Sequence, residues 1–271
     1  MKFRTIVEIE KTDICIKPCE RILFVGSCFA NNIGKRFEQE KFITTINPYG
    51  TMYNPASVLH TIQKNDKIFD MAVMTFGTNH VYIEKSTGKI VDNCKKRPQQ
   101  LFIEKLLTID ESYLYMKEAI DNLIAINKYI KIILTLSPIR YAKYGFHNSQ
   151  VSKATLLLAI DRIIKKYPLN TYYFPAYEII NDELRDYRFY QADMLHPNDQ
   201  AIEYIWERLV DTMFSDEAKI FLEKWKPIKK ALAHKPFDRE SQEYKDFMIK
   251  TLYSAKELSK QYEGLNINDL L

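Results

Sequence analysis

Short runs of apolar residues alternate with longer segments of helical periodicity, and this alternation limits the possible folds more than any other feature of the chain. The apolar runs lie at 22–25, 42–46, 71–76, 132–136 and 172–174. The segments 31–40, 113–128 and 152–166 place apolar side chains at the three- and four-residue spacing of a helix. Continuously apolar strands that alternate with helices are typical of a parallel sheet covered on both faces. The sequence therefore predicts a doubly wound α/β fold.

Polar or turn-forming residues follow four of these runs. They are Gly-Ser-Cys at 26–28, Asn-Pro-Tyr-Gly at 47–50, Gly-Thr-Asn at 77–79 and Ser-Pro-Ile-Arg at 137–140. Three of the seven glycines thus lie just past a predicted strand, where glycine permits a positive φ and a close backbone approach to a ligand. A single glycine at such a position is weak evidence for a site, because turns use glycine in any case. Three glycines at the corresponding position after three strands are stronger evidence. In this fold class ligands bind beyond the carboxyl ends of the strands, and we expect a site there.

The length and composition indicate one large domain with an appendage. The chain has 271 residues, of which 46% are hydrophobic, so it can bury a sizeable core. A helix is expected to begin near Asn198, a plausible cap. From about Ser215 the composition changes to Lys/Glu-rich amphipathic helix, interrupted by the segment KWKPIKKALAHKPF. We predict an α/β domain over 1–214 and a helical C-terminal extension over 215–271, packed on or beside it.

Charge and motif content argue against several function classes. The net charge is +4, with basic and acidic residues interleaved, so no nucleic-acid-binding stripe stands out. Neither a signal peptide nor a bilayer-spanning apolar stretch is evident, and we expect a soluble cytoplasmic protein that does not bind membranes. Four cysteines without a second Cys/His pair at finger-like spacing predict neither a disulfide framework nor a metal site. The common phosphate-binding glycine motifs are absent, and no cofactor is predicted.

Two neighbouring residues, Ser27 and Cys28, are candidate nucleophiles at the end of the first strand. Ser27 could instead satisfy backbone groups in the turn, and Cys28 could be a small buried apolar residue. At the start of a helix, the macrodipole would favour the thiolate of Cys28. Asp193 and His196, spaced D-x-x-H, form the best candidate for a base oriented by a carboxylate. The alternative is an ordinary loop aspartate beside a histidine satisfied by backbone.

Further side chains could complete such a site. Asn79 could donate its amide to an oxyanion, together with backbone N–H groups near Gly50 and Cys28, although asparagine is also frequent in turns. Arg140 directly follows a strand and is a candidate for binding an anionic substrate group. Arg185 and Arg188 lie beside acidic residues in the segment ELRDYR, which favours structural ion pairs for both.

Seven segments between about residues 20 and 210 form a joint pattern, in the order LFVGSCFANNIG, NPYGTMYNP, FGTNHVYIEKSTGKIVDNCKKRP, LTLSPIRY, SKATL, YFPAYEIINDELRDYRFYQADMLHP and AIEYIW. The first and the penultimate are highly specific. Together the segments resemble the GSCFA family, a member of the SGNH/GDSL hydrolase superfamily. The resemblance implies a flavodoxin-like three-layer α/β/α sandwich with a mainly parallel sheet.

The superfamily also implies four site blocks. They supply a nucleophile, a glycine oxyanion donor, an asparagine donor and a D-x-x-H pair, and the last three are similar to Gly50, Asn79 and Asp193 with His196. The usual first block is Gly-Asp-Ser. An ungapped match on Gly26 puts Cys28 in the place of the serine, whereas a shift by one residue would restore Ser27 at the cost of altering the tight turn. Turn geometry favours Cys28.

The combined features predict an esterase or acyl-transfer enzyme with a Cys/Ser-His-Asp site. Its substrate would be a small-molecule or carbohydrate ester, as superfamily analogy suggests. The alternative is a non-catalytic module that binds a glycan or metabolite in the same cleft, suggested by the missing aspartate of the first block. A structural protein that binds a partner through its basic tail is a third reading.

Overall fold

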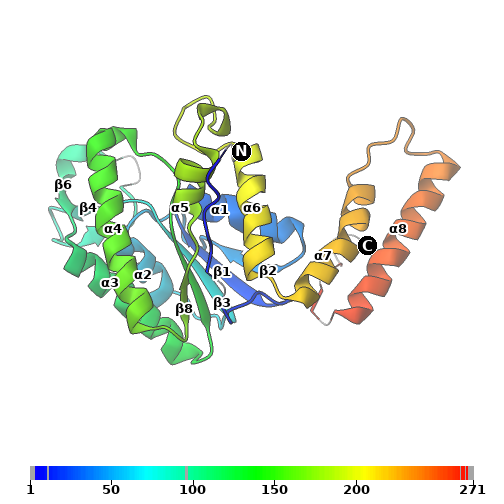
Figure 1. Ribbon diagram of the computed structural model, residues 1–271, viewed down its shortest axis with the longest axis horizontal. Coiled ribbons are helices and arrows are strands. Elements are labelled where there is room, and N and C mark those ends of the chain that lie inside the picture. The colour runs from blue at the N-terminus through cyan, green and yellow to red at the C-terminus, as the bar shows by residue number, and fades with distance from the viewer. Residues whose placement is uncertain (1–3, 11, 95–96, 263, 266, 268–271) are drawn as a thin grey trace.

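A five-stranded parallel sheet forms the centre of the computed structural model, which describes residues 4–10, 12–94, 97–262, 264–265 and 267 (Figure 1). Its strands, in the order β2-β1-β3-β7-β8, coincide with the five predicted runs. They are β1 (Arg21–Gly26), β2 (Ile43–Ile46), β3 (Met71–Phe76), β7 (Lys131–Leu136) and β8 (Thr171–Tyr173). The chain passes from β1 to β2 on one side and then crosses to β3 on the other. The carboxyl ends of β1 and β3 therefore form a topological switch point.

Strand β1 is buried on both of its faces. Ile22 and Phe24 belong to one hydrophobic cluster, whereas Leu23 and Val25 belong to another, and all four side chains are fully buried. Successive side chains of a strand point to opposite faces, so a strand covered on both sides must be apolar throughout. This is the physical reason for the continuous apolar runs in the sequence.

Helices cover both faces of the sheet. The first face carries α2 (Pro55–Gln63), α3 (Ile109–Ile126) and α4 (Phe146–Lys166), and the second carries α1 (Cys28–Gln39) and α6 (Asp199–Met213) (Figure 1). Each of the three predicted helices begins earlier than the periodicity indicated: α1 at Cys28, α3 at Ile109 and α4 at Phe146. The predicted three-layer α/β/α sandwich is confirmed.

Short helical segments join these elements. After β8 the chain forms α5 (Ala176–Glu178), a π-helical stretch at Ile179–Leu184 and a 3₁₀ turn at Tyr187–Phe189, before Asn198 caps α6 as predicted. Two more 3₁₀ turns lie at Gln99–Leu101 and Ala142–Tyr144.

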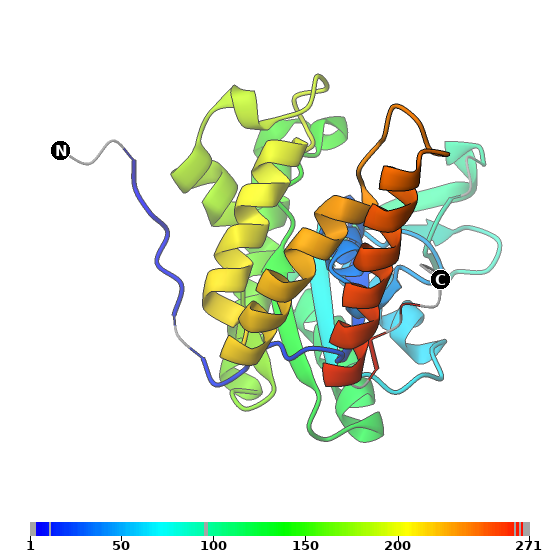
Figure 2. The ribbon, with the colours of Figure 1, turned by 90° about the vertical axis from the view of Figure 1, so that its right-hand side faces the viewer.

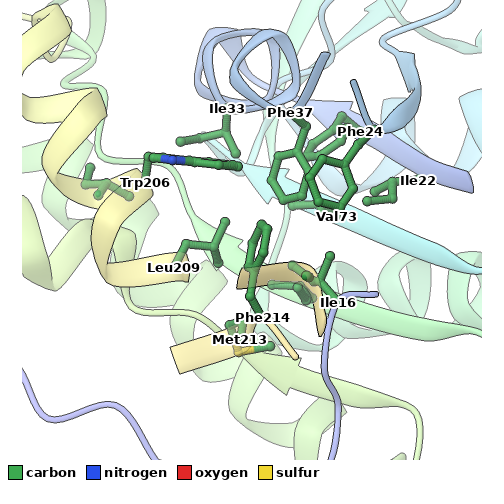
Figure 3. Packing of buried hydrophobic residues seen from close by; sticks show 14 of the residues in the cluster. Ile16, Ile22, Phe24, Ile33, Phe37, Val73, Trp206, Leu209, Met213 and Phe214 are labelled. Carbon is green, nitrogen blue, oxygen red and sulfur yellow. The ribbon is translucent and has the colours of Figure 1, made fainter. Parts of the chain in front are cut away.

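An aromatic cluster joins α1 to the sheet and to α6 (Figure 3). The Phe37 ring lies at its centre, with ring centroids 4.9 Å from Trp206, 5.0 Å from Phe24, 5.2 Å from Phe42 and 5.5 Å from Phe214. Tilted and edge-to-face aromatic pairs of this kind stabilise a core beyond their buried area. The cluster fixes α1 against β1, and so fixes the turn that connects them.

A small antiparallel sheet follows β3 and was not predicted from the sequence. Its strands β4 (His80–Glu84), β5 (Ile90–Val91) and β6 (Phe102–Leu106) are arranged in the order β5-β4-β6. Gly88, with φ of 67°, lies in the turn between β4 and β5. This sheet brings residues of β4 and of the segment after β5 to the switch-point side of the molecule.

The C-terminal segment forms the helices α7 (Asp216–Leu232) and α8 (Gln242–Gln261), which pack against each other (Figure 2). The expectation that KWKPIKKALAHKPF interrupts the tail is corrected: α7 continues through Pro227 and ends at Leu232, so only the second part of that segment is irregular. Trp225 and Ile228 are buried on either side of the proline, and their packing holds the helix together. The Trp225 indole donates to the Gln39 carbonyl at 3.1 Å, which ties α7 to the end of α1. The division of domains at residue 214 stays a prediction.

Within the described part of the chain, no helix is both long enough and apolar enough to cross a bilayer.

Candidate active site

The turn after β1 requires a glycine at position 26. Gly26 has a φ of 139°, which other residues rarely adopt, and a Cβ there would clash with the Thr75 carbonyl of β3. The Gly26 N–H donates to Asn47 Oδ1 at 2.8 Å, which ties the end of β1 to the residue after β2. The turn therefore fixes where the next two residues, Ser27 and Cys28, can lie.

Ser27 is a buried structural residue in this arrangement. It is fully buried and is the N-cap of α1, where its hydroxyl accepts from the Phe29 N–H at 3.2 Å. The same Oγ lies 2.9 Å from Ser137 Oγ and 3.1 Å from Thr75 Oγ1. The hydroxyl thus links the carboxyl ends of β1, β3 and β7, and Ser27 does not belong to the lining of the cavity described next.

Cys28 lines a cavity of about 510 Å³ at the switch point. The lining also includes residues of the small antiparallel sheet and of the segment after β7, where His80 stacks on Tyr144 with ring centroids 3.5 Å apart. The Cys28 Sγ lies 3.8 Å from the Tyr53 hydroxyl. Burial, with the Cys28 sulfur beside it, raises the pKa of Tyr53 to about 12. Tyr53 therefore keeps its proton at neutral pH.

Asp193 and His196 form the pair that their spacing predicted. The His196 Nδ1 lies 2.6 Å from Asp193 Oδ2, while Asp193 Oδ1 accepts from the Leu195 and His196 backbone N–H groups at 2.8 and 3.0 Å. These backbone donors, together with the imidazole, lower the pKa of Asp193 to about 2. The carboxylate stays ionised at neutral pH and fixes the imidazole ring. His196 lines the same cavity as Cys28.

Arg140 supports the loop that carries this pair. Its backbone N–H donates to the Leu195 carbonyl at 3.1 Å, and its Nη1 donates to the Met194 carbonyl at 2.9 Å. Met194 has a φ of 58°, an uncommon conformation for a residue with a side chain, so the loop depends on such contacts. Arg140 also lines the cavity, and its predicted role in substrate binding stays a prediction. Of the other two arginines, Arg188 forms an ion pair with Asp186, as expected.

The structure does not bring the predicted oxyanion donors Gly50 and Asn79 into the cavity lining. The Gly50 N–H donates to the Asn47 carbonyl at 2.8 Å, which closes the turn after β2. The Asn79 side chain is buried, and its Nδ2 donates to the Leu107 carbonyl at 2.7 Å. The Gly50 N–H and one N–H of the Asn79 amide are thus committed to local structure, because each satisfies a backbone carbonyl.

A buried lysine behind the cavity was missed by the sequence analysis. Lys153 of α4 is 3% exposed, and its Nζ donates to the Ser137 carbonyl at 2.6 Å and lies 4.9 Å from the centroid of the Tyr141 ring. Burial lowers the pKa of Lys153 to about 7. Its position one turn before the buried Leu156, on the apolar stripe of α4, was the available signal.

Two tyrosines of the cavity were missed as well. Tyr141 packs edge-on against Tyr53, with ring centroids 6.1 Å apart. The Tyr141 hydroxyl is buried over Gly77, where a Cβ would clash with it, and it has no hydrogen-bond partner among the described residues. Tyr53 precedes the N-cap of α2 in the sequence, but nothing in the local pattern indicates that its ring turns towards Cys28.

Among the residues that the structure describes, no group of three or more histidine, cysteine, aspartate or glutamate side chains is placed to hold a metal ion. The four cysteines are free thiols.

Comparison with known proteins identifies the relatives of this chain. The sequence profile of the GSCFA family matches residues 21–68 and 64–209, and the profile of the GSCFA domain protein, C-terminal domain, matches residues 225–271. No curated protein matches the chain.

Similar solved structures include two variants of Axe2 from Geobacillus stearothermophilus. One, described as an acetyl-xylooligosaccharide esterase with a tryptophan replaced by isoleucine, is 10% identical with a TM-score of 0.50, covering 74% of this chain and 97% of its own. The other, a catalytic mutant of this acetylxylan esterase, is 12% identical with a TM-score of 0.49 and the same coverage. A carbohydrate esterase family 3 protein from Talaromyces cellulolyticus is 10% identical with a TM-score of 0.43, covering 75% and 99%. At these identities the likeness shows the fold, a mostly parallel sheet between helices as in SGNH-type esterases.

Proposed function

The chain belongs to the GSCFA family, and on that premise we propose that it is an esterase or acyl-transfer enzyme acting on an acyl ester. One observation carries the proposal: Cys28 and His196 line the same cavity, and His196 is held by the ionised carboxylate of Asp193. A nucleophile, a base and a group that orients the base are the parts that acyl transfer requires.

The residues act in the following order. Asp193 fixes Nδ1 of His196, so the other ring nitrogen takes the proton of the Cys28 thiol. The thiolate attacks the carbonyl carbon of the ester, and the carbonyl electron pair moves to its oxygen. When the electron pair returns to re-form the carbonyl double bond, the C–O bond to the alcohol breaks and His196 gives its proton to the departing oxygen. Water, or an acceptor hydroxyl in acyl transfer, then releases the acyl group from the sulfur by the same route.

An acylated carbohydrate is the substrate class that the cavity favours. Four tyrosines contribute to its lining, namely Tyr53, Tyr82, Tyr141 and Tyr144. Aromatic rings offer apolar faces on which the C–H faces of sugar rings can pack, and tyrosine adds a polar edge for hydroxyl groups. The structural likeness to carbohydrate esterases agrees with this choice at the level of the fold.

Hydrolysis of p-nitrophenyl acetate and of acetylated xylooligosaccharides by the full chain tests the proposal. We expect Cys28→Ala and His196→Ala to abolish turnover, and Asp193→Asn to lower kcat strongly because the imidazole loses its orienting charge. Cys15→Ala is the matched control, since Cys15 is a free, half-buried thiol outside the cavity. A wild type that is no faster than His196→Ala on every ester would overturn the proposal.

A non-catalytic binding module is the second candidate. It is favoured by Ser27, which stands where the superfamily has an aspartate and whose hydroxyl is committed to Thr75 and Ser137. A thermal-shift screen with xylooligosaccharides separates the two candidates. Stabilisation that persists in Cys28→Ala and His196→Ala, without any turnover by the wild type, would favour the binding module.

A further inference from the structure

Two side chains with hydrogen-bond donors that the superfamily pattern does not predict line the same cavity as Cys28. An acyl-transfer site needs donors aimed at the carbonyl oxygen, because negative charge develops there in the transition state. The predicted donors of Gly50 and Asn79 are bound to the carbonyls of Asn47 and Leu107. Among the side chains that line the cavity with Cys28, the consecutive residues Tyr53 and Asn54 both carry hydrogen-bond donors.

Tyr53 is held firmly with its hydroxyl towards the sulfur. Its carbonyl accepts from the Gly77 and Thr78 N–H groups at 2.9 Å each, which anchors the backbone to the end of β3. The edge contact with Tyr141 restrains the ring, and the hydroxyl lies 3.8 Å from Cys28 Sγ. When the Cys28 sulfur bonds to the carbonyl carbon of an ester, the carbonyl oxygen lies one bond further on. A hydroxyl that lies 3.8 Å from the sulfur can therefore reach this oxygen. The raised pKa of about 12 keeps the Tyr53 proton in place as a donor.

Asn54 presents a second donor whose orientation is fixed. Asn54 is the N-cap of α2, and its Oδ1 accepts from the Ser57 N–H at 2.9 Å. This bond determines which end of the amide is the oxygen, and therefore fixes where the Nδ2 group lies. Asn54 is 7% exposed and lines the cavity, and Nδ2 donates to no atom within the described residues. An unpartnered amide in a nearly buried side chain at the cavity wall is available to a ligand.

We propose that Tyr53 and Asn54 are the oxyanion donors of this site, an inference that rests on the proposed function. When the Cys28 sulfur bonds to the ester carbon, the carbonyl electron pair moves to the oxygen, and the Tyr53 O–H and Asn54 N–H groups donate hydrogen bonds to it. Neither donor loses its proton. As the pair returns, the alcohol leaves with the proton from His196, and the same two donors act again when water attacks the thioester.

Two variants remove the donors with little change of shape. Tyr53→Phe deletes one hydroxyl, and Asn54→Asp removes the N–H donor while keeping an oxygen that caps α2. Loss of one oxyanion donor typically lowers kcat about 100- to 1000-fold, and we expect each variant to lower kcat on p-nitrophenyl acetate by about 100-fold with KM little changed. Tyr49→Phe is the control, because its hydroxyl donates to the Lys64 carbonyl and Tyr49 is outside the cavity lining. Thermal unfolding confirms that each variant is folded.

Alkylation by iodoacetamide separates this role from an effect on the thiol. Displacement of iodide by the Cys28 thiolate forms no oxyanion, so its rate, followed by mass spectrometry of the Cys28 peptide, reports only the reactivity of the sulfur. We expect Tyr53→Phe to leave alkylation within about threefold of the wild type while ester turnover falls. Equal losses in both reactions, or unchanged turnover in both variants, would overturn the inference. A wild type without turnover would instead overturn the proposed function, and this inference with it.

Discussion

Replacing Lys153 with methionine is expected to change how the stability of the protein depends on pH. The amine is buried behind the cavity, and its pKa is lowered to about 7. In the unfolded chain it returns to the ordinary value of about 10.4. Between these two values the unfolded state binds more protons than the folded state, so the stability supplied by this group rises with pH.

The size of the effect follows from the two pKa values. From pH 7 to pH 9 the unfolded lysine stays almost fully charged, whereas the folded amine goes from half charged to neutral. The difference in bound protons therefore grows from about one half to nearly one over this interval. Integrated over two pH units at about 1.4 kcal/mol per proton and pH unit, it amounts to about 2 kcal/mol of folding free energy.

Urea unfolding at pH 7 and pH 9 measures this difference. We expect the stability of the wild type, relative to Lys153→Met, to increase by about 2 kcal/mol between the two pH values. The variant loses the donor to the Ser137 carbonyl at either pH, so its absolute stability is not the readout. Lys166→Met serves as the control, because Lys166 is exposed at the end of the same helix. If the wild type and Lys153→Met change equally with pH, the buried amine is charged in the folded protein and the reasoning fails.

Three further substitutions test other parts of the structure. Ser27→Ala should lower stability by about 1–3 kcal/mol in urea unfolding, because it removes the N-cap of α1 and a buried hydroxyl network, and should leave ester turnover detectable; abolished turnover in a folded variant would move the nucleophile to Ser27. Gly77→Ala should cost about 1–3 kcal/mol and lower turnover, because the new Cβ displaces the Tyr141 ring; unchanged melting and activity would show that the ring yields freely. Trp225→Ala should lower the free energy of unfolding by about 3–5 kcal/mol, because it leaves a cavity where the buried indole was. If circular dichroism and fluorescence both report a single unfolding transition, independent domains at 1–214 and 215–271 are argued against.

The fold could be predicted because its determinants are local and repeated. Each strand of the parallel sheet is a continuous apolar run between turn residues, and Asn198 marks the start of α6 by ordinary capping chemistry. The antiparallel sheet was missed because its strands are short and partly exposed. Val81 and Phe102 are the only apolar side chains of these three strands that are buried. A weak alternation over two to five residues does not stand out in a sequence.

The side-chain contacts of the candidate site were predictable only where chain neighbours determine them. Asp193 and His196 lie three residues apart, and their contact follows from the turn that joins them. The environments of Asn79 and Lys153 depend instead on segments that are distant in sequence. Asn79 donates to Leu107 at the end of β6, and Lys153 meets Ser137 at the end of β7. No pattern within either local segment shows which partner the side chain finds.

The burial of Ser27 gives a physical reason for the register in which Cys28 takes the place of the superfamily's serine. In Gly-Asp-Ser, an ungapped match puts the aspartate at the N-cap of the following helix, and aspartate and serine are both preferred N-cap residues because each offers an oxygen to the first free N–H groups. Ser27 fills that cap in this chain, and the next residue, at the first position of α1, lines the cavity. A shift by one residue would place the nucleophile at the cap, where its oxygen is already bonded to the helix and to the hydroxyls of Thr75 and Ser137. The helix start therefore separates the two positions: the cap residue holds the turn, and its neighbour, the proposed nucleophile, lines the cavity.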